Sequence, residues 1–298
     1  MTTRKIIDFH THCFPKKLAQ RAVDSVSWQN PHRLNGTLQA QLDFIRQNRL
    51  MGCALAHMAS RPDTMRHVNT FAVSTMGRGR FVFGSVHPAA QNAIAQIHWL
   101  YEHGIKGVKF HTGHQQFNFD DSSFLPVYRE IGRLGMVTLI HCGPSARSSL
   151  HLVYPKTVSN VIDAFAGAPF ICAHMGGVTP ADKDFSLLCS LPVYADTALV
   201  PRMLDSVKLA VAVEKMGAHR VLFGSDLPWG DFERTREITD QAAELFPHLD
   251  WNAVFFGNAV SLAEQAGGNI SWFWAYLKTQ YSCAISTKSK WKRDGQKQ

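Results

Sequence analysis

The chain contains 298 residues, of which 45% are hydrophobic and 18% are charged. These proportions are typical of a globular protein that buries a sizeable core. The formal net charge is +8, but five basic residues and one acidic residue in the segment 288–298 account for half of it. Because the rest of the chain is only mildly basic, we expect no nucleic acid as a partner.

Cysteine usage and hydropathy bear on the compartment. The six cysteines form no CxxC pair and no spacing typical of a secreted disulfide framework. The N-terminal residues lack the apolar stretch of a signal peptide, and the apolar segment 270–277 is far too short to span a bilayer. We therefore expect a soluble, cytoplasmic protein with free thiols and no membrane partner, while the sequence leaves a homo-oligomer open.

Short apolar runs rich in strand-forming residues recur along the chain and predict strands. They cover residues 5–10, 53–58, 80–86, 105–110, 136–141, 169–174, 192–196 and 220–226. Between them, helices are predicted at residues 37–50, 89–103, 123–134, 157–165, 202–216 and 232–245. Several predicted helices end in glycine, as helices often do, namely at Gly52, Gly104, Gly135, Gly167 and Gly217.

The alternation of strands and helices predicts βαβ units and a parallel sheet that is buried on both faces. Eight such units favour an α/β fold of the (β/α)8 TIM-barrel type. An open, doubly wound sheet has the same pattern, but no G-x-G-x-x-G motif follows the first strand. We predict one barrel domain at residues 1–268, with a ninth helix near 251–267, and a C-terminal extension at 269–298 that is basic and mobile at its end.

Polar side chains at the carboxyl ends of the strands are candidates for chemistry, because the active sites of TIM barrels lie there. His10 ends the first run and His12 follows two residues later, so in an extended segment both imidazoles face the same side. His141 closes the fifth run, His174 the sixth and Asp226 the eighth. These side chains converge only if the barrel closes.

Imidazoles and a carboxylate together form a site suited to Zn2+, with Mn2+ and Fe2+ as alternatives. If one coordination position stays open, a bound water becomes acidic enough to ionise near neutral pH, and a neighbouring carboxylate can take its proton. An HxH pair alone is a weak signal. The placement of five polar groups at strand ends favours a metal site over a set of unrelated hydrogen-bonded residues.

Six motifs follow one another in the chain: IIDFHTHCFP, GVKFH, LIHCG, AHMGG, LFGSDLPW and FFGNAVSLAE. Together they resemble the amidohydrolase-related family of TIM-barrel enzymes, in particular its aminocarboxymuconate-semialdehyde decarboxylase-like branch. The resemblance implies that His10, His12, His141 and Asp226 are metal ligands. It also implies that His174 acts as an acid/base or polarises the substrate.

Lys109 has three readings. Its side chain could form a carbamate that bridges two metals, and His174 would then be a ligand of the second metal. Alternatively, Lys109 could contact an anionic substrate, or it could be structural. The GVKFH context resembles the branch with a single metal, so we expect one ion and place Lys109 among the substrate-binding residues. His111 points to the same side as Lys109 and is expected to line the pocket. Trp229, close behind Asp226, is expected to form a pocket wall, with packing as the alternative.

Other polar residues near the strand ends are open to two readings. His57 and His87, near the ends of the second and third runs, are either rim contacts or buried hydrogen-bonded residues. Asp196 closes the seventh run but could equally cap the following segment. Cys13 and Cys142 adjoin proposed ligands, and an extended backbone would point each away from its neighbouring histidine, which favours a structural role.

The leading functional hypothesis is metal-dependent hydrolysis of a small carbonyl, amide or lactone substrate, with Asp226 handling the proton and His174 stabilising the developing oxyanion. The compact connections of the chain favour this reading. The alternative is a metal-dependent, non-oxidative decarboxylase of an aromatic or enoic acid. The second alternative is a non-catalytic binding barrel, against which the presence of all five site positions argues. We expect the substrate to be a small anionic molecule.

Overall fold

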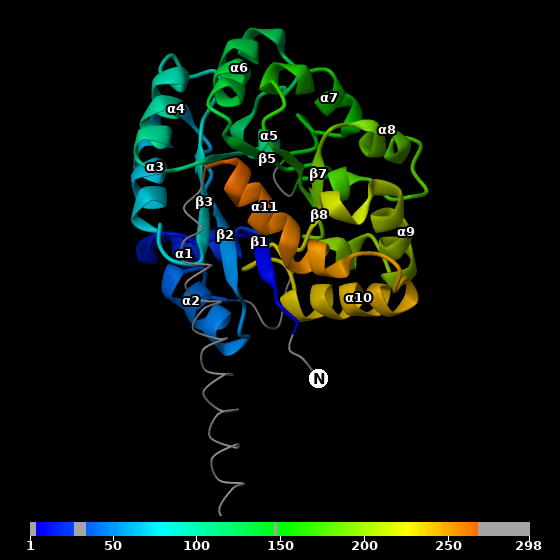
Figure 1. The fold of residues 1–298 in the computed structure, drawn as a ribbon. Coiled ribbons are helices and arrows are strands. Elements are labelled where there is room, and N and C mark those ends of the chain that lie inside the picture. Colours follow the sequence, from blue (N-terminus) through cyan, green and yellow to red (C-terminus); the bar gives the residue numbers. More distant parts are fainter. Residues whose placement is uncertain (1–3, 27–33, 146–147, 268–298) are drawn as a thin grey trace, which may run out of the picture. The chain divides into compact units, whose positions relative to one another are not determined.

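The computed structural model describes residues 4–26, 34–145 and 148–267. Within them, eight parallel strands form one sheet whose order follows the chain from β1 to β8. Figure 1 shows these strands inside a ring of helices. All eight predicted strands are confirmed, with shorter bounds: β1 Ile7–Thr11, β2 Gly52–Ala56, β3 Arg80–Ser85, β4 Gly107–Phe110, β5 Val137–Ile140, β6 Phe170–Cys172, β7 Tyr194–Asp196 and β8 Val221–Leu222.

Backbone hydrogen bonds between the segment after β8 and strand β1 bring the two edges of the sheet together. The Asp226 N–H donates to His10 O at 2.8 Å, and the His12 N–H donates to Leu227 O at 2.7 Å. An open sheet would leave these edge groups without partners. The TIM barrel is therefore confirmed, and its seam is built from three of the predicted metal ligands.

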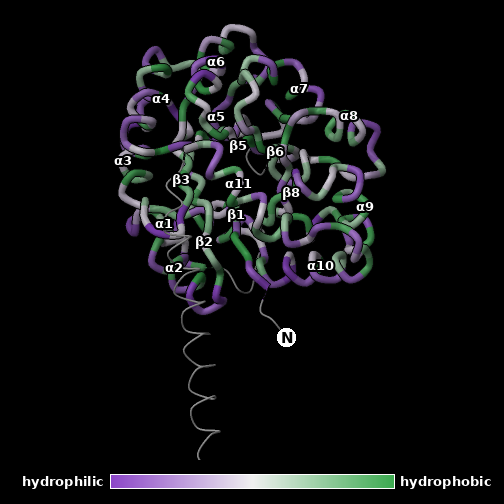
Figure 2. The backbone as a smooth tube through the Cα atoms, viewed as in Figure 1, coloured by the Kyte–Doolittle hydropathy of each residue, from purple (hydrophilic) through white to green (hydrophobic). Residues whose placement is uncertain are grey.

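The helices outside the barrel lie between consecutive strands, except the last two, which follow the eighth strand. They are α1 Lys16–Asp24, α2 Leu38–Gln47, α3 Met65–Ser74, α4 Ala93–Glu102, α5 Thr112–Gln115, α6 Leu125–Arg133, α7 Pro155–Ser159, α8 Phe185–Ser190, α9 Ser206–Met216, α10 Phe232–Leu245 and α11 Asn258–Gln265. Figure 2 shows hydrophilic segments concentrated on the outer helices, whereas the strands are largely hydrophobic. None of the helices in the described ranges is long and apolar enough to cross a membrane.

The interior of the barrel is filled by side chains that alternate along the strands. Phe9 and Phe83 meet edge to face, with ring centroids 6.1 Å apart, beside the small side chains Ala54 and Ala56. Leu262 of α11 belongs to the same buried cluster. Figure 1 shows α11 lying across one opening of the barrel. This end is therefore closed by apolar packing, which leaves the opposite, carboxyl end of the strands for chemistry.

Three features of the connections differ from prediction. Helices α1, α3, α5 and α8 are absent from the prediction, and α5 and α8 span only four and six residues. The helix predicted at 157–165 is interrupted: α7 ends at Ser159, and Val161 has a non-helical φ of −131° before the short 3-10 turn Ile162–Phe165. Gly52 does not end a helix but begins β2, whereas Arg49 takes the positive φ of 54°. The predicted extension, 269–298, lies outside the described residues.

Candidate metal centre and substrate cavity

The two histidines of the HxH motif face one carboxylate, as the alternation of a strand predicts. His10 lies in β1 and His12 immediately follows it. Asp226 Oδ1 is 3.0 Å from His12 Nε2 and 3.4 Å from His10 Nε2. All three side chains are buried. The closed barrel thus brings residues more than 200 positions apart into one group.

The remaining ring nitrogens determine which atoms could bind a cation. His12 Nδ1 lies 2.7 Å from the carbonyl oxygen of Ala56, which can only accept, so this nitrogen carries the hydrogen. His10 Nδ1 lies 2.7 Å from Asp196 Oδ2 and donates to it in the same way. In neutral rings, both Nε2 atoms then present lone pairs towards the negative Asp226 carboxylate. Three acceptors that face one another fit a bound divalent cation.

Two groups of side chains in the described part of the chain have cation-sized spacing, and both contain His10. One is His10, His12 and Asp226, and the other is His10, His174 and Asp196. Ligands at about 2.0–2.2 Å from a tetrahedral zinc lie about 3.4 Å from each other. The separations of 3.0 and 3.4 Å in the first group suit such an ion, whereas the 2.7 Å contact in the second is a direct hydrogen bond.

The left-handed conformation of Asp226 aims its carboxylate at the centre. Its φ is 67°, a value that aspartate tolerates better than most residues. The amides of Trp229 and Gly230 donate to its carbonyl oxygen, at 2.9 and 2.8 Å, and close a tight turn. Burial would raise the pKa of the carboxyl, but the adjacent imidazoles of His12 and His10 hold that pKa well below its usual range. Asp226 is therefore an anion ready to bind a cation.

Lys109 reaches the same centre from β4. Its Nζ lies 3.3 Å from His10 Nε2, and the residue is only 1% exposed. Burial lowers the pKa of Lys109 to about 8, although the Asp226 and Asp196 carboxylates act in the opposite direction. The ammonium thus lies beside the nitrogen of His10 that would bind a cation. This position suits a residue that contacts a substrate bound at the centre.

A cavity of about 100 Å³ opens above these residues. Its walls combine the predicted ligands with apolar and further polar groups: His10, His12, Phe14, Val26, Ala56, Met58, Lys109, His111, His114, His141, Pro144, Leu199, Asp226 and Trp229. Trp229 lies against His12, with ring centroids 5.0 Å apart, and against Phe14 at 5.6 Å. The three predicted substrate-binding residues, Lys109, His111 and Trp229, all line this cavity.

His141 and His174 lie side by side but outside the His12–Asp226 group. His141 Nδ1 is 3.1 Å from His174 Nε2. His174 Nδ1 faces the carbonyl oxygen of Ala198 at 3.0 Å, and His141 Nε2 faces that of Pro144 at 3.0 Å. Carbonyl oxygens only accept, so His174 Nδ1 and His141 Nε2 must donate. In two neutral rings, His174 Nε2 and His141 Nδ1 would then face each other with lone pairs. This contact fits a shared proton or a cation, even though burial lowers the pKa of both histidines.

Two residues of the site are not identified by the sequence prediction. Asp196 accepts the His10 hydrogen bond, a role that its position at the end of the seventh run could not distinguish from a cap. His114 also lines the cavity and is absent from the sequence prediction. Its ring lies 4.2 Å from that of His111, which in turn stacks on His141 at 3.8 Å. The H-x-x-H spacing, which places both rings on one side of a helical turn, was the available signal.

The two histidines and two cysteines that the sequence left open are buried residues with structural roles. His57 is buried and its Nε2 lies 3.0 Å from Thr75 Oγ1. His87 is buried and bonds the Gln115 carbonyl oxygen at 2.8 Å. Cys13 and Cys142 are buried, and burial raises the pKa of Cys13 to about 12, so its thiol stays protonated.

The comparisons with known proteins give the family and the fold. The family model described as amidohydrolase matches residues 7–266. An uncharacterised TIM-barrel protein from Bordetella bronchiseptica superposes with a TM-score of 0.67 at 18% identity, covering 88% of this chain and 99% of that one. 5-Carboxyvanillate decarboxylase from Sphingomonas paucimobilis superposes with a TM-score of 0.66 at 17% identity, covering 87% of this chain and 98% of that one. A probable 2-pyrone-4,6-dicarboxylic acid hydrolase from Acinetobacter baumannii superposes with a TM-score of 0.61 at 15% identity, covering 88% of this chain and 99% of that one. None of the curated proteins matches the chain.

Proposed function

Because the chain belongs to the amidohydrolase family, we propose that it is a metal-dependent hydrolase of a small, anionic carbonyl, amide or lactone substrate. The observation that carries this proposal is the convergence of His10 Nε2, His12 Nε2 and Asp226 Oδ1, with a hydrogen bond behind each imidazole. These residues would hold one ion, with His141 as the further ligand that the family resemblance implies. Nitrogen and oxygen donors at this spacing favour Zn2+, with Mn2+ and Fe2+ as alternatives.

When bound, the ion would polarise the substrate carbonyl and make a water more acidic. The chain's own groups have separate tasks. Asp226 stays anionic and can take a proton from a water in the cavity. His174, whose Nε2 lies 3.1 Å from His141 Nδ1, can stabilise an oxyanion or return the proton. Trp229 and Phe14 form an apolar wall that excludes water from one side of the substrate.

Lys109 supports the anionic character of the substrate. Its ammonium is buried at the floor of the cavity, where it could bind a carboxylate as a charge-assisted hydrogen-bond donor. The same observation favours the second candidate, a decarboxylase of an aromatic or enoic acid. There, Lys109 would hold the carboxylate in place and His174 would supply the proton that replaces it.

Substrate assays should separate the two candidates. Purified protein is expected to contain about one equivalent of a divalent transition metal per chain. A panel of lactones, amides and hydroxybenzoates, with carbon dioxide measured separately from hydrolysis, distinguishes the reactions. His10→Ala and Asp226→Asn should lose both metal and activity. His103 is exposed at the end of α4, outside the cavity, so His103→Ala should keep both. Protein that is produced with adequate metal and contains none would refute the proposal.

The cellular setting is part of the same proposal. Four of the five cysteines in the described ranges are buried, and all five are free thiols. Free thiols are typical of a reducing compartment, which supports the cytoplasm as the place of action.

A further inference from the structure

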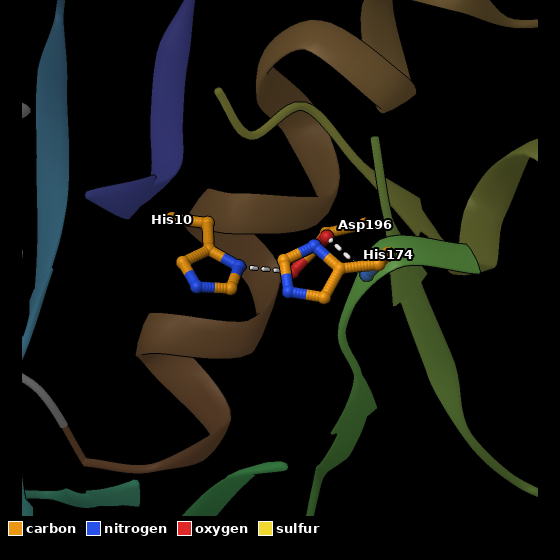
Figure 3. A group of neighbouring side chains, drawn as sticks. All are labelled: His10, His174 and Asp196. Atoms are coloured by element: carbon orange, nitrogen blue, oxygen red, sulfur yellow. Dashed lines mark hydrogen bonds and ion pairs between the residues drawn. The ribbon is translucent and has the colours of Figure 1, made fainter. Parts of the chain in front are cut away.

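Asp196 connects two parts of the centre that lie on different strands (Figure 3). It is the last residue of β7 and is 1% exposed. One carboxylate oxygen, Oδ2, accepts the hydrogen of His10 Nδ1 at 2.7 Å. The other, Oδ1, accepts from the backbone N–H of His174 at 2.8 Å and from that of Ala198 at 3.1 Å. Both oxygens therefore accept hydrogen bonds, Oδ2 from the His10 ring and Oδ1 from two backbone N–H groups.

We propose that Asp196 is a positioning residue that holds His10 in the tautomer able to bind a metal and anchors the turn that carries His174. This inference rests on the metal-dependent function proposed above. Strand β7 would thus support the metal centre through Asp196, although no residue of β7 lines the cavity.

The position of a single hydrogen atom decides which nitrogen of His10 can bind a metal. A neutral imidazole carries one hydrogen, on Nδ1 or on Nε2. A carboxylate beside Nδ1 keeps the hydrogen there, so that the lone pair of His10 lies on Nε2, the atom facing Asp226 and His12. Partners of this kind orient metal-binding histidines and make them better ligands.

The turn that carries His174 has a strained backbone. His174, Met175, Gly176 and Gly177 all have positive φ values, of 57°, 51°, 69° and 71°. A left-handed backbone is unfavourable for residues with a Cβ, so the turn persists only where surrounding contacts hold it. The bond from His174 N to Asp196 Oδ1 fixes its first residue. The ring of His174 is thereby kept against that of His10, with centroids 5.1 Å apart.

Asp196→Asn tests the tautomer with almost no change of shape. The amide oxygen of Asn would stay with the two backbone N–H groups, because an NH2 group there would face two donors. The NH2 group would then face His10 Nδ1, force that atom to accept, and move the ring hydrogen to Nε2. Metal affinity should fall about 10- to 100-fold, the usual effect of losing such a partner.

Thr197→Val is the matched structural control. Thr197 follows β7 and is buried, and its hydroxyl both donates to Gly224 O and accepts from Gly224 N, each at 3.0 Å. The variant therefore loses two hydrogen bonds between the segments after β7 and β8, and no bond to His10. We expect Thr197→Val to lower the melting temperature of the metal-free protein but to keep its affinity for Zn2+. Asp196→Asn should do the reverse.

The measurements are Zn2+ affinity by competition with a chromophoric chelator, melting temperature without metal, and the visible absorption spectrum with Co2+. An altered Co2+ spectrum and weaker Zn2+ binding in Asp196→Asn alone support the inference. Asp196→Asn that binds Zn2+ within threefold of the unmodified protein overturns it, as does Thr197→Val that loses as much affinity. If the unmodified protein and His10→Ala both bind no Zn2+, the metal-dependent function itself fails and the inference with it.

Discussion

Two loops approach each other closely behind His141 and His174, and this contact predicts a large effect of one methyl group. Gly177 has a φ of +71°, and a Cβ placed there would lie 2.4 Å from Gly143 N and 2.5 Å from Gly143 Cα. Both are backbone atoms, so no side-chain rotation can relieve the overlap. The substitution Gly177→Ala therefore has to move one of the two loops.

The cost has two parts. A residue with a Cβ in the left-handed region costs about 1–2 kcal/mol. Forcing a methyl group into a packed contact typically costs about 1–3 kcal/mol more. We expect the free energy of unfolding of Gly177→Ala to fall by about 2–5 kcal/mol. Gly167→Ala is the matched control, because Gly167 has a φ of +76° but a Cβ there would meet nothing within 4 Å.

Urea denaturation of the metal-free proteins measures both variants. The difference between them isolates the contact and should be about 1–3 kcal/mol. Equal destabilisation, to within about 0.5 kcal/mol, would show that the contact carries no free energy and would refute the reasoning. Because the displaced loops carry His141 and His174, Gly177→Ala should also lose activity, whereas Gly167→Ala should keep it.

Two further substitutions test buried titratable side chains. Burial, with the nearby His12, lowers the pKa of His57 to about 3, so its contribution to stability is complete above about pH 6.5 and is lost as the pH falls towards 3. His57→Gln should make the loss of stability in that range shallower by up to about 1.4 kcal/mol per pH unit, and equal slopes in urea denaturation would contradict this. Lys109→Met should keep or tighten metal binding, since the ammonium lies 3.3 Å from His10 Nε2, and should raise KM for an anionic substrate by about tenfold or more. Loss of metal from this variant would instead indicate a bridging carbamate.

Features that depend on neighbouring residues could be predicted from the sequence. The eight strands were located correctly because each is a short apolar run, and a parallel sheet buried on both faces requires such runs. The shared orientation of His10 and His12 follows from the two-residue repeat of a strand. Helix α10, Phe232–Leu245, was predicted with its bounds because Asp231 caps its first turn and its apolar repeat is long. The prediction of one continuous helix at 157–165 was wrong, because the backbone at Val161 leaves the helical region. The apolar spacing of the segment does not reveal this break.

Features that depend on distant residues were decided by the tertiary structure. The sequence places Asp226 at the end of a strand, but only closure of the barrel brings its carboxylate to 3.0 Å from His12. Asp196 looked like a possible cap until the fold set it 2.7 Å from His10, a residue 186 positions away. Local periodicity fixes which way a side chain points, because it arises within one strand. The partner of that side chain is set by the curvature and register of the whole sheet, and these emerge only when all eight strands pack together.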